Sequence, residues 1–314
     1  MTEIAFLKAI LTYFALALII FLSAYLFSAD VAIFFSIFLL IPILMWQQNY
    51  LKKEKISKQV DGRGKGTILF WIFTLFILAL LVRIPSALLF GMPYEKTPLI
   101  YLTVFTIIVI EKTDISAFGF KTQNIGKALF HGLIFYAILG GLTLLTNYLL
   151  VYVFTNQTPV QSYAIPLFLL AMPFHTLCVG VSEEGFFRGY VQTHLEKFYG
   201  ANRAILIQAA LFGIWHFVWD LNPFNPWGMV QYIALAFFIG LPFGYFYSKA
   251  RNLASVIIVH GLWNSVQLGI IANQAAFDAL QSIPIAAQIL TLLLPYAISV
   301  IAAILFVKFA VKEI

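Results

Sequence analysis

The stretch LFLLAMPFHTLCVGVSEEGFFRGY, residues 167–190, carries the strongest evidence on the fold class. It begins as an apolar run without Asp, Glu, Lys or Arg, and Glu183, Glu184 and Arg188 then follow within a few residues. Such a run predicts a helix inside a membrane. An ionisable side chain there costs roughly 2.5–3.5 kcal/mol to insert, so most such groups face a cavity or a partner. The alternative is that the helix leaves the membrane here and places its charges at the interface.

The composition of the whole chain extends this prediction. Of its 314 residues, 62% are hydrophobic and 10% are charged, and the mean hydropathy is +0.93. Soluble proteins have about 25% charged residues, which cover the surface that faces water. The composition therefore excludes a soluble enzyme, a disordered chain, a coiled coil and a nucleic-acid-binding protein. The predicted fold class is all-α, a polytopic transmembrane helical bundle.

Candidate membrane spans follow one another along nearly the whole chain. A spanning helix needs about 20 mostly apolar residues. The second and fourth runs are shorter, which leaves tilted, interfacial or re-entrant arrangements open for them, so we expect eight to ten spans. The candidate runs are residues 5–27, 31–46, 67–90, 98–110, 128–154, 163–187, 204–219, 229–247, 253–271 and 285–308.

Lysine and arginine gather in alternate connections between these runs. The linker 50–66 is rich in them, whereas the connections 155–162, 220–228 and 272–284 contain none. Because basic connections stay on the cytoplasmic side, ten spans place both termini in the cytoplasm. The net charge of +6 then reflects orientation and not nucleic-acid binding. We expect an integral, multi-pass protein of a bacterial cell membrane, whose partners include the lipid bilayer and no nucleic acid.

A polar connection over residues 111–127 indicates a division of the chain. Its charged residues are typical of an amphipathic cytoplasmic segment. We predict an N-terminal transmembrane extension over residues 1–111, a core that carries the chemistry over 112–272, and a C-terminal transmembrane helix over 273–314. The extension shows no obvious chemistry in its sequence.

The first polar cluster places two glutamates on different sides of one helix. Glu184 and Arg188 are four residues apart and can form an ion pair on a shared face. Glu183 is turned about 100° away by the helical period, which leaves it available to act as a general base. His194, in the basic turn before Lys197, is expected to be solvated.

Two further clusters bring imidazole and amide groups to membrane depth. Phe212 lies one turn before His216, and His260 lies one turn before Asn264. An imidazole and a carboxamide can both donate hydrogen bonds to a developing oxyanion. The alternatives are a core histidine bound to a backbone carbonyl and a polar clamp between helices.

The depths of these residues agree if the chain reverses near Ala201. Glu183 lies before that turn and His216 lies after it, at similar distances along antiparallel helices. His260 enters the membrane from the same side, after Arg251. We therefore predict that the carboxylates, the imidazoles and the carboxamide meet in one cavity that faces the cytoplasm.

In this order and spacing, the three clusters resemble the CPBP family. This is the CAAX-protease and bacteriocin-processing group, also called Abi, which includes the Ras-converting CAAX endopeptidase. The resemblance covers about residues 115–271 and implies an intramembrane endopeptidase that acts on peptide or protein substrates at the membrane. The motifs that carry it are Glu183-Glu184-x-x-x-Arg188, Phe212-x-x-x-His216 and His260-x-x-x-Asn264.

The resemblance implies catalytic roles for four residues. Glu183 would activate the attacking water, and His216 would assist as a base or a water ligand. His260 and Asn264 would stabilise the oxyanion of the tetrahedral intermediate.

Three more residues would support this set. Glu184 and Arg188 would hold the helix and the charge of Glu183 in place, and Phe212 would pack on the imidazole one turn later or line a groove. No Ser-His-Asp order stands out, and a buried Cys178 would be a poor nucleophile. Water activated by a carboxylate is then the simplest route.

A zinc ion is the alternative to a metal-free site. Glu183, His216 and His260 would be its ligands, two histidines and one carboxylate. The helical His-Glu-x-x-His signature is absent from the sequence. We therefore predict no cofactor, and zinc stays open as the alternative.

Other function classes would use the same residues. A non-proteolytic membrane scaffold or a bacteriocin self-immunity protein would use the cavity to bind a partner. A transporter would use the glutamate and the histidines as a proton relay. The complete catalytic set favours the endopeptidase.

Overall fold

Helices account for almost all of the described chain, which comprises residues 2–53, 56–60, 63–92 and 94–313. The predicted all-α class is confirmed. Residues 54–55 and 61–62 of the predicted basic linker lie outside the described residues. Within the described part, the sheet consists of two short antiparallel strands, β1 (Val160–Tyr163) and β2 (Ile270–Ala272).

Five helices precede the polar connection. They are α1 (Thr2–Leu26), α2 (Ala29–Phe38), α3 (Leu40–Lys53), α4 (Lys65–Phe90) and α5 (Lys96–Phe105), and α5 continues as a π-helix over Thr106–Ile110.

The remaining helices form the second half of the molecule. They are α6 (Ile125–Tyr136), α7 (Leu142–Thr155), α8 (Ile165–Phe174), α9 (Val181–Glu184), α10 (Thr193–Trp215), α11 (Pro226–Ala250), α12 (Ala254–Gly269), α13 (Gln274–Ser282) and α14 (Ile285–Ala310). Short 3-10 helices cover Ile115–Phe118 and His216–Asp220, and π-helices cover Ala137–Gly141, His175–Gly180 and Gly185–Gln192.

The predicted number of spans agrees with this architecture. Seven helical segments of the described chain are long and apolar enough to cross a membrane. The longest, residues 165–220, holds two crossings because the chain reverses at Gly200, whose φ of +73° is a conformation that glycine adopts readily. Two shorter helices, residues 96–110 and α12, complete the ten predicted runs. The chain is an integral, multi-pass membrane protein.

The short helix α5 lies inside the bundle. Residues 96–104 are all buried, and α5 packs against α1 and α9. An interfacial or re-entrant position would leave one face of this helix uncovered. Its first residue, Lys96, is therefore held in the interior.

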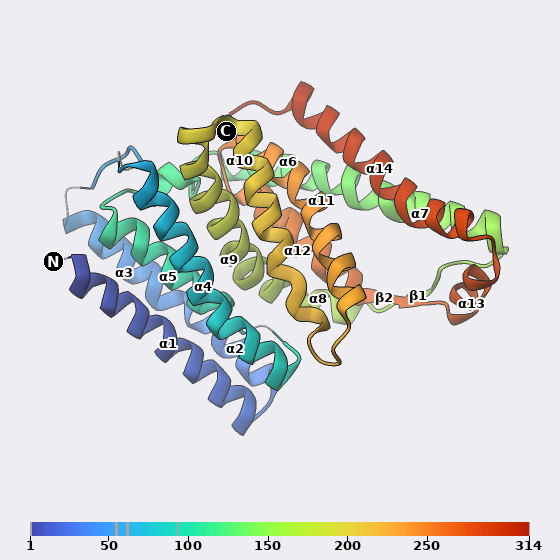
Figure 1. Ribbon diagram of the computed structural model, residues 1–314, viewed down its shortest axis with the longest axis horizontal. Coiled ribbons are helices and arrows are strands. Elements are labelled where there is room, and N and C mark those ends of the chain that lie inside the picture. The colour runs from blue at the N-terminus through green and yellow to red at the C-terminus, as the bar shows by residue number, and fades with distance from the viewer. Residues whose placement is uncertain (1, 54–55, 61–62, 93, 314) are drawn as a thin grey trace.

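The two largest of four hydrophobic cores in the described chain join most of the helices. One core joins α1, α4 and α5 to residues 186–195 and to the second half of α10. The other joins α6, α11, α12 and α14. Figure 1 shows α1–α5 on one side of α9 and α10, and α7 with α14 extending away on the other side. The N-terminal helices thus form one wall of the region in which the predicted catalytic residues lie.

The basic connections meet at one end of the bundle, which we call the basic end. It consists of residues 56–60, 111–124, 196–203 and 251–253. Lys197 Nζ donates to the carbonyl of Val60 at 2.7 Å, and Arg251 pairs with Glu196 at 2.6 Å. The backbone of Leu253 bonds that of Gly119 at 2.8 Å. The connections 94–95, 156–164, 221–225 and 270–284 lie at the other ends of the helices, which we call the opposite end.

Candidate active site

A cavity of about 410 Å³ lies among α5, α9, α10, α11 and α12. All four predicted catalytic residues line it: Glu183, His216, His260 and Asn264. The rest of its wall is mainly apolar and aromatic, and includes Phe174, Phe212, Leu235, Ile239, Phe243 and Trp263. The structure thus brings together four of the five groups that the depth estimate predicted to meet, and the fifth, Glu184, does not line the cavity.

Close packing of α12 against the chain before Glu183 positions these groups. Gly261 makes this packing possible, because a Cβ there would lie 2.1 Å from Thr176 Oγ1. Helix α9 itself is a short α-helical piece between π-helical turns at 175–180 and 185–192. Such turns occur frequently at functional sites.

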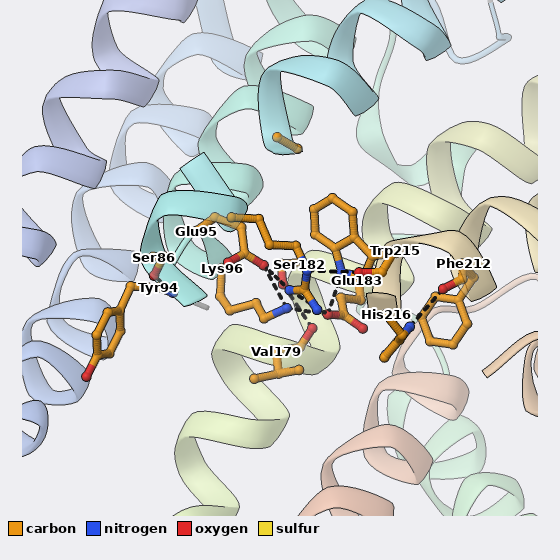
Figure 2. Close-up of polar contacts among 12 residues, drawn as sticks. Ser86, Tyr94, Glu95, Lys96, Val179, Ser182, Glu183, Phe212, Trp215 and His216 are labelled. Carbon is orange, nitrogen blue, oxygen red and sulfur yellow. Dashed lines mark hydrogen bonds and ion pairs between the residues drawn. The ribbon is translucent and has the colours of Figure 1, made fainter. Parts of the chain in front are cut away.

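The two carboxylate oxygens of Glu183 have different surroundings, although the residue is only 2% exposed. Oε1 accepts hydrogen bonds from Lys96 Nζ and from Trp215 Nε1, the latter at 2.9 Å, and Arg83 Nη1 lies 3.8 Å away. Oε2 has no hydrogen-bond partner in the described chain and lies 3.6 Å from His260 Nε2. Figure 2 shows the side chains of Lys96 and Trp215 directed toward Glu183. One oxygen is thus held and the other remains able to accept a proton.

Glu184 lies behind the cavity wall and joins two of the predicted residues. Its Oε1 accepts from Arg188 Nη1 at 3.2 Å, which is the predicted i,i+4 ion pair, and lies 2.6 Å from His260 Nδ1. Both Glu184 and Arg188 are fully buried. Because a carboxylate accepts the Nδ1 proton, it orients the imidazole so that Nε2 points toward Glu183. The support that Glu184 gives therefore reaches His260 directly.

His216 lies where α10 ends. Its Nδ1 is 2.7 Å from the carbonyl oxygen of Phe212, which can only accept, so Nδ1 carries the proton. The other ring nitrogen, Nε2, is then left as an acceptor. The ring of Phe212 packs on His216 with centroids 4.6 Å apart, and on the guanidinium of Arg188 at 4.1 Å. Phe212 thus packs on the imidazole of His216, and it also contacts Arg188, which the sequence did not predict.

Asn264 lies one turn after His260 on α12 and is half-buried at the cavity wall. Within the described chain, no hydrogen bond holds its amide group. The carboxamide is therefore free to donate to a group that enters the cavity.

The cavity extends toward the opposite end of the bundle. Met92, Trp219 and Leu268 line it, and each lies near a connection at that end. Trp219 and Leu268 are exposed. The sequence predicted a cytoplasm-facing cavity together with cytoplasmic basic connections, whereas residues near the opposite end line part of the cavity. The depth estimate located the residues correctly but carried no information on which way the helices diverge.

Three charged residues of the site were not predicted, and all lie before residue 111. Arg83 Nη1 pairs with Glu95 Oε1 at 2.5 Å, and Lys96 Nζ lies 2.8 Å from the same oxygen. Arg83 Nε also donates to the carbonyl of Trp215 at 3.0 Å. The N-terminal helices therefore contribute chemistry that their sequence did not reveal. The one signal was Arg83 itself, an isolated charge in the apolar run 67–90.

The predicted solvation of His194 is wrong. The residue is 0% exposed, and its Nε2 lies 3.1 Å from Glu111 Oε2. Tyr190 Oη donates to the other oxygen of Glu111 at 2.7 Å. The polar connection after residue 110 folds over this part of the chain and covers His194, an effect that neighbouring lysines along the sequence do not reveal.

Zinc stays the alternative to a metal-free site. Among the described residues, no group of three or more His, Cys, Asp and Glu side chains is arranged to hold a metal ion.

Comparison with known proteins agrees with the motifs. Residues 165–266 match the family model described as type II CAAX prenyl endopeptidase Rce1-like. No curated protein and no solved structure matches the chain. The matched segment contains all seven predicted catalytic and supporting residues, whereas Arg83, Glu95 and Lys96 lie outside it. Residues 165–266 are thus similar to the Rce1-like type II CAAX prenyl endopeptidases, a protease group of the CPBP family, which is the family that the three motifs resemble.

Proposed function

We propose that the chain is an intramembrane endopeptidase that hydrolyses membrane-associated peptides with a water molecule activated by Glu183. The observation that carries this proposal is the unpartnered Oε2 of Glu183 at the wall of a cavity that also presents His216, His260 and Asn264. A buried carboxylate with a free oxygen can serve as a general base toward water bound there.

The reaction proceeds by attack of this water on a peptide carbonyl. Glu183 Oε2 takes a proton as the water oxygen bonds the carbonyl carbon, and the carbonyl electrons move to the oxygen. Asn264 Nδ2–H donates to that oxyanion, and His260 donates from Nε2 when both of its ring nitrogens carry a proton. The proton then moves to the leaving nitrogen as the C–N bond breaks, which releases an acid and an amine.

The supporting residues act through the imidazoles. Glu184 keeps the Nδ1 proton of His260, and Arg188 compensates the charge of Glu184. The Phe212 carbonyl holds Nδ1–H of His216, so that its Nε2 can hold the attacking water.

The substrate class follows from the apolar cavity wall. Phe174, Leu235 and Ile239 favour apolar side chains or a lipid-modified segment next to the cleaved bond. The description of the matching family is a CAAX prenyl endopeptidase, and a prenylated peptide would combine both features.

We infer that substrates enter from the opposite end, since Trp219 and Leu268 at that end are exposed cavity residues. If the lysine-rich basic end is cytoplasmic, the entrance lies on the extracytoplasmic side. Single cysteines at Gln161 and at Lys249, in a Cys178→Ala background, test this in intact cells. A membrane-impermeant maleimide should label the Gln161→Cys variant and should label the Lys249→Cys variant only after permeabilisation. The reverse pattern would contradict the inferred side.

Peptide profiles of membranes test the activity. Cells that express the wild type should accumulate cleaved membrane peptides that cells with Glu183→Gln, at equal protein level, do not produce. A quenched fluorescent peptide built on the cleaved sequence then gives rates for the purified protein in nanodiscs. Identical profiles of the two strains would overturn the proposal, and uptake in liposomes that depends on Glu183 would favour a transporter.

A further inference from the structure

The charged residues at the start of α5 extend the site beyond the segment that matches the family. Glu95 and Lys96 precede the matched residues by many positions, and both are buried, at 0% and 2% exposure. Lys96 also lines the cavity, next to Glu183. A lysine is rarely buried in this way unless it is paired with a carboxylate.

One buried group contains two cations and two carboxylates: Lys96, Arg83, Glu95 and Glu183. Glu95 binds both cations through its Oε1. Arg83 is fixed by Glu95 and by the carbonyl of Trp215, so it cannot move to replace Lys96. Lys96 is thus the cation in direct contact with Glu183.

We propose that Lys96 is a positioning residue for Glu183 and that the N-terminal helices thereby form part of the active site. Lys96 and Trp215 hold Oε1, which fixes the carboxylate so that Oε2 lies toward His260. Lys96 also balances the charge of Glu183 where water cannot do so. This inference rests on the proposed role of Glu183 as the base.

Without the ammonium group, the carboxylate loses both its direct cation and a hydrogen bond that sets its orientation. Arg83 Nη1, at 3.8 Å, is too distant to replace that bond. The base would then leave the geometry that attack requires. Small displacements of catalytic groups lower the rate constant more than they lower substrate binding.

Kinetics of Lys96→Met, Lys96→Arg and Lys249→Met in nanodiscs test this role. The probe is the quenched fluorescent peptide that the wild type cleaves. Lys96→Met should lower kcat about 100-fold, with little change in KM, because the base is misplaced. Lys96→Arg should retain more activity than Lys96→Met. Lys249→Met removes a lysine at the end of α11, outside the site, and should cleave like the wild type.

Chemical rescue separates a role of the ammonium group from a general effect on folding. Lys96→Ala leaves room next to the cavity, so added methylammonium should restore part of kcat, whereas tetramethylammonium, which is larger and has no N–H, should not. If Lys96→Met fails to fold, the double variant Glu95→Gln/Lys96→Met keeps the buried group neutral and should still cleave slowly.

A double-mutant cycle in thermal stability adds a readout that needs no substrate. Lys96→Met and Glu183→Gln remove the two partners of one ion pair, so the loss of stability in the double variant should be smaller than the sum of the single losses. Additive losses would show that the pair is not coupled and would overturn the inference.

The outcomes distinguish this inference from the proposed function. Full activity of Glu183→Gln would overturn the proposed function. An inactive Glu183→Gln together with a wild-type kcat in Lys96→Met would overturn only the role of Lys96. A low kcat in Lys96→Met would also contradict positioning by the ammonium group if methylammonium does not rescue Lys96→Ala and Lys96→Arg is no more active than Lys96→Met.

Discussion

Two buried glutamates of this molecule link the N-terminal half to residues 165–220, and they differ in how their oxygens are used. Glu111 binds Tyr190 Oη through one oxygen and His194 Nε2 through the other. Glu183 binds Lys96 and Trp215 through Oε1, and its Oε2 has no hydrogen-bond partner in the part of the chain that is described.

The comparison shows that burial and charged partners alone do not identify a catalytic carboxylate. Both glutamates are almost fully buried, and both have a histidine within 4 Å. With both oxygens bound, Glu111 links helices near the basic end. Glu183 lines the cavity and has an oxygen left for a water molecule. Glu95 and Glu184 also have one oxygen without a hydrogen-bond partner in the described chain, but neither lines the cavity, so the combination of a free oxygen and a place in the cavity wall distinguishes Glu183.

Replacing the histidine next to each glutamate should give the largest difference in kcat. His260 lies next to Glu183, and His194 lies next to Glu111. His260→Ala should lower kcat about 1,000-fold, since it removes a general acid–base or oxyanion group from the site. His194→Ala should lower stability and keep kcat near the wild-type value. Rates at saturating peptide, together with thermal unfolding of each variant, measure both effects. Equal losses of kcat in the two variants would contradict the different roles of His260 and His194.

The polar groups of α12 give a contrast within the cavity itself. Asn264→Ala should lower kcat about 100-fold, because it removes a donor to the oxyanion. Gln267, three residues later, also lines the cavity but is assigned no contact with the reacting atoms, so Gln267→Ala serves as the matched control. The same peptide assay measures both. If Gln267→Ala loses more kcat than Asn264→Ala, Asn264 is not the residue that donates to the oxyanion.

Removing the hydroxyl of Tyr190 tests whether Glu111 stabilises the fold. Tyr190→Phe leaves Glu111 Oε1 without its donor, which should lower the free energy of unfolding by about 1–3 kcal/mol. Cleavage per folded molecule should not change. Unfolding titrations measure this loss against Tyr25→Phe, whose side chain is 79% exposed. A Tyr190→Phe variant that is as stable as Tyr25→Phe would contradict the role of Glu111 as a link.

Metal removal should have the smallest effect. The proposed reaction uses Glu183, His216, His260 and Asn264 without a metal ion, so dialysis against a zinc chelator should leave kcat unchanged. Loss of cleavage that added zinc restores would contradict the proposal and would favour the two-histidine, one-carboxylate alternative.

The fold and several contacts of the site could be predicted from local features of the sequence. Hydropathy located the ten helical runs, because lipid-facing helices must be apolar. The i,i+4 spacing predicted the Glu184–Arg188 pair, and the helical rise placed Glu183 and His216 at one level. These predictions depend only on the geometry of helices and on one reversal, near Gly200.

The rest depends on contacts between distant parts of the chain. Lys96 and Glu183 are 87 residues apart, and neither run of sequence indicates that α5 lies next to α9. His194 is buried by Glu111, 83 residues earlier, so its basic neighbours in sequence were misleading. The direction of the cavity depends on how the helices diverge, which hydropathy does not encode.

Single-turnover cleavage by the wild type, Glu183→Gln and Glu111→Gln in nanodiscs tests most directly whether Glu183 is the base. Each variant replaces one buried carboxylate with its amide. All three proteins are used at the same concentration, in excess over the peptide. The Glu183→Gln variant should cleave at least about 1,000-fold more slowly than the wild type while it still binds the peptide. The Glu111→Gln variant should cleave at close to the wild-type rate. A Glu183→Gln variant as fast as the wild type would contradict the mechanism.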